Sequence, residues 1–350
     1  MVVARGNQNK RGLPPVLRCI AFEMRFRVSL CPMRGATSLR FDPADALAFQ
    51  AARRMCRSAE DLAFAVRFLD RTKRDAVCSV VAFFGMIADA VGRNAAELSG
   101  GHGLRQHPAV VSPAGACCGG GESEQLLIAF RGRLDQIFDG RLELPSPEAR
   151  SPQQHALHAF ARTVARSGIN RQHFLLFADE RAPDATITRY PTWTKLEQHC
   201  RATGGSIAGA IGEVLGLQHS DAPRAIEKLG VGLRFVQILR DVNVDRARGR
   251  IYLPLEDLAC CRYSERELLA GVANERLDDL WRFECDRARA LFAEGADAIR
   301  WIAGDKSKLF AATIVTLAEA TLRRPPSRPH LTTAMRLRQL PAAWRLARVT

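Results

Sequence analysis

The spacing of apolar residues is the feature that most constrains how this chain can fold. From Asp45 to about residue 323, apolar side chains recur every three or four positions, as on amphipathic helices, and no stretch alternates with period two. We therefore predict an all-α fold in a single domain. The helices are expected over 45–57, 59–69, 72–91, 122–138, 152–166, 171–178, 193–217, 222–246, 264–271, 274–303 and 306–323.

Composition divides the chain into a helical body with two flanking segments. Residues 1–40 show no helical period, and residues 1–44 are predicted to be a basic, disordered N-terminal extension. The body is expected over 45–323, interrupted at about 99–121 by a flexible insertion rich in Gly, Pro, Ser and Ala. A Pro-rich stretch ends the regular pattern, so residues 324–350 are expected to form a basic C-terminal tail.

Basic residues gather at the two ends of the chain. The formal charge is +14, of which residues 1–57 contribute +8 and residues 321–350 contribute +7, so the body is close to neutral. A nucleic-acid groove needs basic residues organised on the fold, so no nucleic-acid partner is expected. Arginine-rich ends suit an anionic lipid surface or solubility at least as well. A peripheral membrane contact therefore stays open.

Two further patterns bear on where the protein resides. The longest uncharged apolar stretch, Ala76–Ala88, has 13 residues and is shorter than the ~20 that a membrane span needs. The ten cysteines include no Cys-x-x-Cys spacing, which argues against a zinc ribbon or a redox motif. We expect a cytoplasmic protein with reduced thiols.

The helix expected over 222–246 contains two carboxylates on one face. Asp241 and Asp245 are four residues apart, and Gln237 lies one turn earlier on the same side. Two like charges so placed repel each other, whereas a hard divalent cation such as Mg²⁺ favours oxygen ligands and reverses the sign of that interaction. Alone, this spacing is more typical of a solvated helix face. The neighbouring basic residues make the pattern more specific.

Three arginines accompany the acidic pair. Arg240 precedes Asp241, and Arg248 and Arg250 belong to the string Arg-Gly-Arg-Ile-Tyr-Leu-Pro that ends at Pro254. A planar guanidinium binds phosphate oxygens in a bidentate manner. The segment thus combines residues suited to a divalent cation with residues suited to a phosphorylated substrate.

The whole string from Gln237 to Pro254 resembles the second aspartate-rich motif of the squalene/phytoene synthase family of head-to-head prenyl transferases. Upstream, Arg189–Trp193 followed by His199–Cys200 resembles another segment of that family. Lys73–Ala76, which leads to Ala82 and Phe83, resembles the helix that carries the first aspartate-rich motif. The resemblance covers about residues 45–320.

The resemblance implies an isoprenoid-synthase-type all-α fold around a central apolar cavity. It also implies a reaction in which two prenyl diphosphates, farnesyl (C15) or geranylgeranyl (C20), join through a cyclopropyl intermediate. Mg²⁺ and basic residues would neutralise the leaving diphosphate, and NADPH would be needed only if the product is squalene. Products of this type belong to isoprenoid pathways such as carotenoid or hopanoid biosynthesis.

The resemblance assigns roles to individual residues. Asp241 and Asp245 are the expected catalytic residues, and they form the expected metal site with Gln237 and Asp89. The residues expected to bind the substrate diphosphate are Arg234, Arg240, Arg248, Arg250 and Tyr252.

The first aspartate-rich motif departs from the family pattern. Its arginine is replaced by Gly85, and its first and third aspartates by Ala88 and Gly92, so that Asp89 keeps only the middle position. The Ser-x-Ser-Phe stretch that helps to seat a diphosphate aligns with Ala59–Leu62, which lacks both serines.

Substitutions in the second half are milder. Gln237 takes the place of an asparagine, Val244 that of a glutamate and His199 that of a tyrosine, while Arg234 stands where the family has a glutamine. We hypothesise that Arg234 binds phosphate directly and so compensates for a lost cation. Two functions remain open: a working prenyl transferase, which the retained arginine-aspartate string favours, and a non-catalytic relative that binds a lipid or a protein partner, as assembly factors of this superfamily do.

Overall fold

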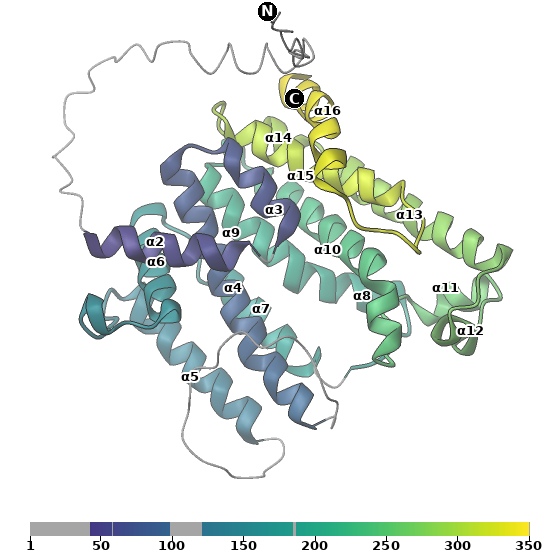
Figure 1. Cartoon of the computed structure of the whole chain (residues 1–350), viewed down its shortest axis with the longest axis horizontal. Coiled ribbons are helices and arrows are strands. Elements are labelled where there is room, and N and C mark those ends of the chain that lie inside the picture. The colour runs from purple at the N-terminus through teal and green to yellow at the C-terminus, as the bar shows by residue number, and fades with distance from the viewer. Residues whose placement is uncertain (1–42, 58, 99–120, 185–186, 350) are drawn as a thin grey trace, which may run out of the picture. The chain divides into compact units, whose positions relative to one another are not determined.

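The all-α prediction is confirmed. The computed structural model describes residues 43–57, 59–98, 121–184 and 187–349, and over these ranges the regular structure is helical, with two isolated β-bridges and no named strand (Figure 1). The expected N-terminal extension and the Gly-rich insertion fall almost wholly outside the described residues. None of the described helices is both long enough and apolar enough to cross a membrane.

The described chain is a succession of helices, some of them only one or two turns long. In chain order they are α2 (Pro43–Cys56), α3 (Glu60–Ala65), η1 (Val66–Phe68), α4 (Arg71–Leu98), α5 (Gly121–Phe138), η2 (Pro147–Ala149), α6 (Pro152–Ser167), α7 (Gln172–Asp184), α8 (Trp193–Cys200), η3 (Arg201–Gly205), α9 (Ser206–Leu215), α10 (Ala222–Ala247), α11 (Leu255–Cys260), α12 (Glu265–Ala270), α13 (Glu275–Gly295), α14 (Asp297–Arg300), α15 (Ser307–Leu322) and α16 (Thr333–Val349).

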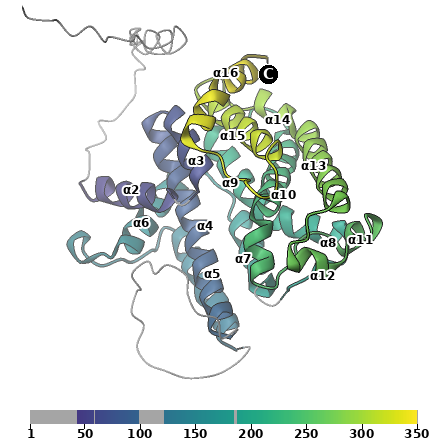
Figure 2. The same cartoon turned by 45° about the vertical axis from the view of Figure 1, so that its right-hand side comes forward.

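Two long helices organise the packing. Helix α10 contacts α8, α9, α13, α14 and α15, and Figures 1 and 2 both show it among these neighbours. Helix α4 packs mainly on α2, α6, α9 and α7. Aromatic rings fill the second group: Phe83 stacks on Phe160 with 3.9 Å between ring centroids, and Phe84 stacks on Phe174 at 4.8 Å. The core is therefore continuous from α4 to α10, with α9 between them.

The helix expected over 193–217 is interrupted by a π-helical turn, η3. At this turn Gly204 meets Gly230 of α10, and a Cβ on Gly204 would overlap the carbonyl oxygen of Gly230 and lie 2.5 Å from the Cβ of Arg234. The two backbones can approach this closely only because neither residue has a side chain. The contact fixes η3 against the part of α10 that carries Arg234.

The C-terminal segment, expected to be a tail, forms helix α16 over Thr333–Val349 and packs on α15. Its Met335 and Leu340 join an apolar cluster with Phe64 of α3 and Leu317 of α15. The one-piece helix expected over 274–303 also differs, because α13 ends at Gly295 and the short α14 follows. The short helix α11 was not expected.

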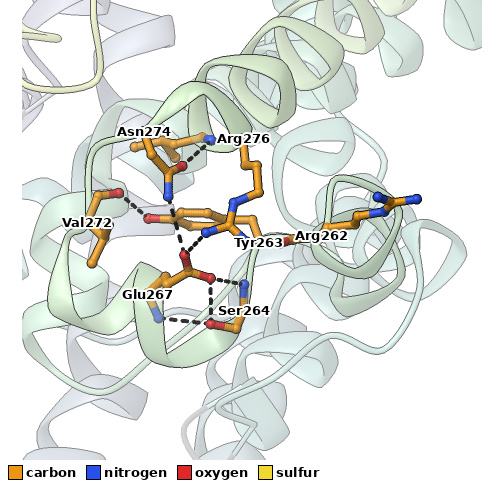
Figure 3. A network of polar contacts seen from close by, with 8 residues as sticks. Arg262, Tyr263, Ser264, Glu267, Val272, Asn274 and Arg276 are labelled. Atoms are coloured by element: carbon orange, nitrogen blue, oxygen red, sulfur yellow. Dashed lines mark hydrogen bonds and ion pairs between the residues drawn. The ribbon is translucent and has the colours of Figure 1, made fainter.

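A polar network fixes the corner between α12 and α13. Ser264 caps α12 in a capping box with Glu267, and Asn274 caps α13 by accepting a hydrogen bond from the backbone N–H of Leu277 (Figure 3). Arg276 of α13 bonds Glu267, and the Tyr263 hydroxyl donates to the carbonyl of Val272 at 2.6 Å. These bonds satisfy helix-end groups and hold α12 against the start of α13.

Replacing Gly204 tests the close contact between η3 and α10. Gly204→Ala should lower the free energy of unfolding by about 1–3 kcal/mol, because the new methyl group overlaps the α10 backbone. Gly132→Ala is the matched control: its Cβ would meet nothing within 4 Å on helix α5, so it should stabilise the protein by up to about 1 kcal/mol. Equal effects of the two substitutions in urea denaturation would contradict the contact.

Candidate active site

The acidic face of α10 forms as expected over the last three turns of the helix. Gln237, Asp241 and Asp245 lie at successive turns, Gln237 exposed and the two carboxylates half-buried. Asp241 accepts two hydrogen bonds from its neighbour Arg240, at 2.8 Å from Nε and 3.0 Å from Nη2. This bidentate pair holds the Asp241 carboxylate and the Arg240 guanidinium together at the side of the helix.

Opposing electrostatic effects act on the carboxyl group of Asp245. Burial raises the pKa of its carboxyl above the ordinary value, and the like charge of Asp241 one turn away raises it further. Arg234, Arg248 and Arg250 act in the opposite direction and lower that pKa. Three of the expected phosphate-binding arginines therefore lie within electrostatic reach of one carboxylate.

Arg234 leaves α10 where that helix meets Gly204 of η3, and its guanidinium has few hydrogen-bond partners. Its Nη1 makes one long hydrogen bond, 3.5 Å, to Oε1 of Gln237. Its Nε is buried and, within the described part of the chain, has no hydrogen-bond partner. A buried guanidinium N–H without an acceptor is costly, and an anionic ligand would satisfy it.

A small hollow adjoins Asp245. The space between its atoms, counted together with open solvent, is about 200 Å³, and it has no room for a water molecule as it stands. Its walls come from α10, the segment after it and α12. The lining residues are Ile238, Val242, Asp245, Arg250, Ile251, Tyr252, Leu253 and Leu268. Of the expected site residues, Asp245, Arg250 and Tyr252 thus share one apolar-walled space.

Aromatic side chains pack against a residue that lines this hollow. Tyr252 stacks on Tyr190 with 5.4 Å between ring centroids, and the Arg250 guanidinium lies 5.7 Å from the Tyr252 ring. His199 is fully buried beside both tyrosines, and its Nδ1 is 3.1 Å from a carboxylate oxygen of Glu180 on α7. The sequence pointed to His199 but not to Glu180, since no motif signals that partner.

Asp89 lies on a different helix from the acidic pair of α10. It is exposed on α4, whose main packing partners are α2, α6, α9 and α7. A Cβ on the nearby Gly85 would meet nothing within 4 Å, so the space beside that position is open. The described residues contain no group of three or more acidic, histidine or cysteine side chains placed to hold a metal ion. The structure therefore does not bring Asp89 into one such group with Asp241 and Asp245.

Helix α3 and helix α16 add charged residues that sequence reasoning missed. Arg336 of α16 bonds Asp61 at 2.8 Å and Glu60 at 2.6 Å, and the charges of both carboxylates also reach Arg240 of α10. Asp61 stands at the second serine position of the Ser-x-Ser stretch in the family pattern. The only sequence signal was that alignment, because Arg336 lay in the segment expected to be a tail.

Removing the charge of Asp245 should stabilise the protein. Since the pKa of Asp245 is raised in the folded state, its contribution to stability falls as the pH rises from the carboxyl's ordinary value through the raised one. Asp245→Asn should therefore increase the free energy of unfolding at pH 7, by about 0.5 kcal/mol because the group remains partly solvated. The gain should vanish near pH 3.

Asp221→Asn, at the exposed start of α10, is the matched control and should change stability little. Urea denaturation at several pH values measures both variants. A loss of stability on Asp245→Asn at pH 7 would contradict the electrostatic description of the site.

Comparison with known proteins places this geometry in a family. The sequence profile described as Squalene/phytoene synthase matches residues 55–346, which is most of the chain. A 15-cis-phytoene synthase of Synechocystis is 31% identical over 236 residues, 62% of this chain and 67% of that protein. A 15-cis-phytoene synthase of Synechococcus elongatus is 30% identical over 191 residues, 51% of this chain and 59% of that protein.

Solved structures agree on the fold. A dehydrosqualene synthase crystallised with a ligand superposes with a TM-score of 0.70 at 18% identity, over 88% of this chain and 100% of that one. A squalene synthase from Alicyclobacillus acidocaldarius gives a TM-score of 0.63 at 23% identity, over 82% of this chain and 100% of that one. With its helical fold and its matching sequence, this chain belongs to the squalene/phytoene synthase family, a family of prenyl transferases.

Proposed function

We propose that the protein joins two prenyl diphosphates, C15 or C20, head to head and releases diphosphate. The observation that carries the proposal is that Asp245 and Arg250 line one apolar-walled hollow, where the charges of Arg234 and Arg248 also act on the Asp245 carboxyl. Guanidinium groups suit the phosphates, and the apolar wall suits the prenyl chain. The family and the relatives named as phytoene synthases support the same reaction class.

The donor set on α10 suits one divalent cation. The carboxylates of Asp241 and Asp245 and the amide oxygen of Gln237 are hard oxygen ligands of the kind that Mg²⁺ prefers. When bound, Mg²⁺ would neutralise charge on the leaving diphosphate. The first motif does not suit a larger metal cluster, because Gly85 and Ala88 provide no ligand and the described residues contain no group of three or more acidic, histidine or cysteine side chains placed to hold a metal ion.

Arginines supply the other countercharge in this proposal. Arg234, Arg248 and Arg250 would hold the phosphate oxygens while the bond between the prenyl carbon and the diphosphate oxygen breaks. The buried Nε of Arg234, which has no hydrogen-bond partner among the described residues, would gain a phosphate oxygen as its acceptor. Arg234, which stands where the family has a glutamine, would in this way compensate for a lost cation. Positive charge from the protein would thus replace part of the charge that metal ions supply.

The apolar side of the site would protect the reactive prenyl cation. Tyr252 and Tyr190 place two stacked rings at and behind the hollow, where the negative faces of the rings favour a cation and exclude water. Typical ligand pockets have ~300–1,000 Å³, whereas this hollow as it stands has no room even for a water molecule, so its walls must move to admit a prenyl chain.

The second candidate is a non-catalytic relative that binds a lipid or a protein partner. The erosion of the first motif favours it: Gly85 and Ala88 replace charged residues, and no three-ligand metal group exists among the described residues. This candidate predicts ligand binding without turnover.

Turnover distinguishes the two candidates. The protein is incubated with farnesyl or geranylgeranyl diphosphate and Mg²⁺, with and without NADPH, and diphosphate release and extracted C30 or C40 products are measured. Asp241→Asn should reduce the rate at least about 100-fold, because the charged partner of Arg240 at the diphosphate site is lost. Arg224→Gln, exposed at the start of α10, is the matched control and should leave the rate unchanged.

Diphosphate release without a hydrocarbon product would argue for a different fate of the prenyl cation. Absence of both at high enzyme concentration would contradict the proposed reaction and favour the binding candidate.

A further inference from the structure

Helix α16 is held on the body by one face. Ala343 on that face is fully buried, and Leu340 packs on the apolar cluster that α3 and α15 share. Arg336 adds a hydrogen bond of 2.8 Å to Asp61 of α3. Figures 1 and 2 both show α16 at the outer edge of the body, so its opposite face points away from the packed helices.

The outward face of α16 exposes large apolar side chains. Leu337 is 49% and Trp344 is 43% exposed, and the exposed Pro341 lies between them in the sequence. With about 3.6 residues per turn, these three positions fall on one side of the helix. At the end of the helix, Val349 is 83% exposed. Single exposed apolar residues are common on soluble proteins, whereas a row of them on one helix indicates an interaction surface.

Arginines accompany this apolar row. Residues 321–350 contain seven Arg and no Asp or Glu. Arg338, Arg345 and Arg348 are exposed on α16, and among the described residues no carboxylate pairs with any of them. The Arg348 guanidinium lies over the Trp344 ring, 3.4 Å from its centroid. The outward face of α16 therefore carries three positive charges that the described part of the body does not neutralise by pairing.

An anionic lipid surface matches both properties of this face. Leucine and tryptophan side chains leave water when they enter the boundary between headgroups and acyl chains, and guanidiniums beside them reach the lipid phosphates. A nucleic acid would use the charges but would leave the apolar row in water. Helix α16 has 17 residues and contains four arginines, which is typical of a helix that lies in a membrane interface.

We propose that the outward face of α16 docks the protein on a membrane surface that contains anionic lipids. The residues that make this contact are Leu337, Trp344, Arg338, Arg345 and Arg348. The helix lies in the plane of the headgroups while its inner face stays packed on α15. The proposal goes beyond the proposed function and does not depend on it, because docking needs neither the diphosphate site nor turnover.

Co-sedimentation of the full-length protein with vesicles tests this proposal, with no prenyl diphosphate present. Phosphatidylcholine vesicles that contain about one third phosphatidylglycerol should bind the protein at least about tenfold more strongly than phosphatidylcholine alone, and the difference should shrink as the salt concentration rises. Arg338→Gln combined with Arg345→Gln should lower the partition coefficient on the anionic vesicles at least about tenfold, since each basic side chain near such a surface contributes about fivefold.

A matched control separates this face from the overall charge of the protein. Arg54→Gln combined with Arg133→Gln removes the same two charges from exposed positions on α2 and α5, which lie away from α16 in Figures 1 and 2. This pair should change the partition coefficient less than twofold.

A second pair of substitutions tests the apolar part of the contact. Leu337→Gln combined with Trp344→Gln leaves every charge in place and should lower the partition coefficient at least about tenfold, because these side chains no longer enter the acyl boundary. All the substituted positions are exposed, so each variant should unfold at nearly the same temperature as the wild type. Thermal unfolding therefore shows that a loss of vesicle binding is not a loss of fold.

Wild-type protein that binds the anionic vesicles no better than phosphatidylcholine would overturn the proposal. So would an apolar variant that binds as tightly as the wild type, or a control pair that weakens binding as much as the α16 pair. Tighter binding to a DNA duplex than to the anionic vesicles, lost in the arginine pair but kept in the apolar variant, would assign the face to a nucleic acid instead. None of these results bears on the diphosphate site, which turnover tests.

Discussion

The mutual repulsion of two carboxylates one turn apart on α10 is the constraint around which the site is built. Asp241 and Asp245 are both partly buried. Like charges repel each other more strongly there than they would in water. The chain balances them in different ways: Arg240 pairs directly with Asp241, and the charges of three arginines lower the pKa of Asp245. A site that carries more positive than negative groups around such a pair is prepared for an anion.

The surrounding fold serves to keep these charges in place. The glycine contact between η3 and α10 sets the position of Arg234, and the capped corner of α12 supplies Leu268 to the wall of the hollow. Helix α4, which carries the first motif, differs from α10. Stacked phenylalanines fill its packed side, and its described residues belong to no group of side chains placed to hold a metal ion. The charge of the site is thus concentrated on α10 and its neighbours.

The sequence was most informative where a helix buries one face over many turns. The prediction over 222–246 matches α10, because its apolar period is long and Pro223 marks its start. The π-turn at η3 was not predictable, because it depends on two glycines meeting across 26 residues of chain. The bond from Arg336 to Asp61 spans 275 residues, and no local pattern in either segment signals it.

The candidate site divides in the same way. The residues of the α10 motif could be named from their spacing and their resemblance to a family, since both are properties of the sequence. The position of Arg250 in the same hollow as Asp245 depends on how the chain turns after α10, where Gly249 adopts a positive φ. Glu180, the partner of His199, comes from a helix with no motif of its own.

A crystal structure with a non-hydrolysable farnesyl thiodiphosphate tests the central claim most directly, namely that the diphosphate lies between α10 and the arginines that come after it. We predict phosphate oxygens within hydrogen-bond distance of Arg234, Arg248 and Arg250, with the prenyl chain in the widened hollow beside Tyr252. Diphosphate bound elsewhere, with these guanidiniums in their present positions, would contradict the account.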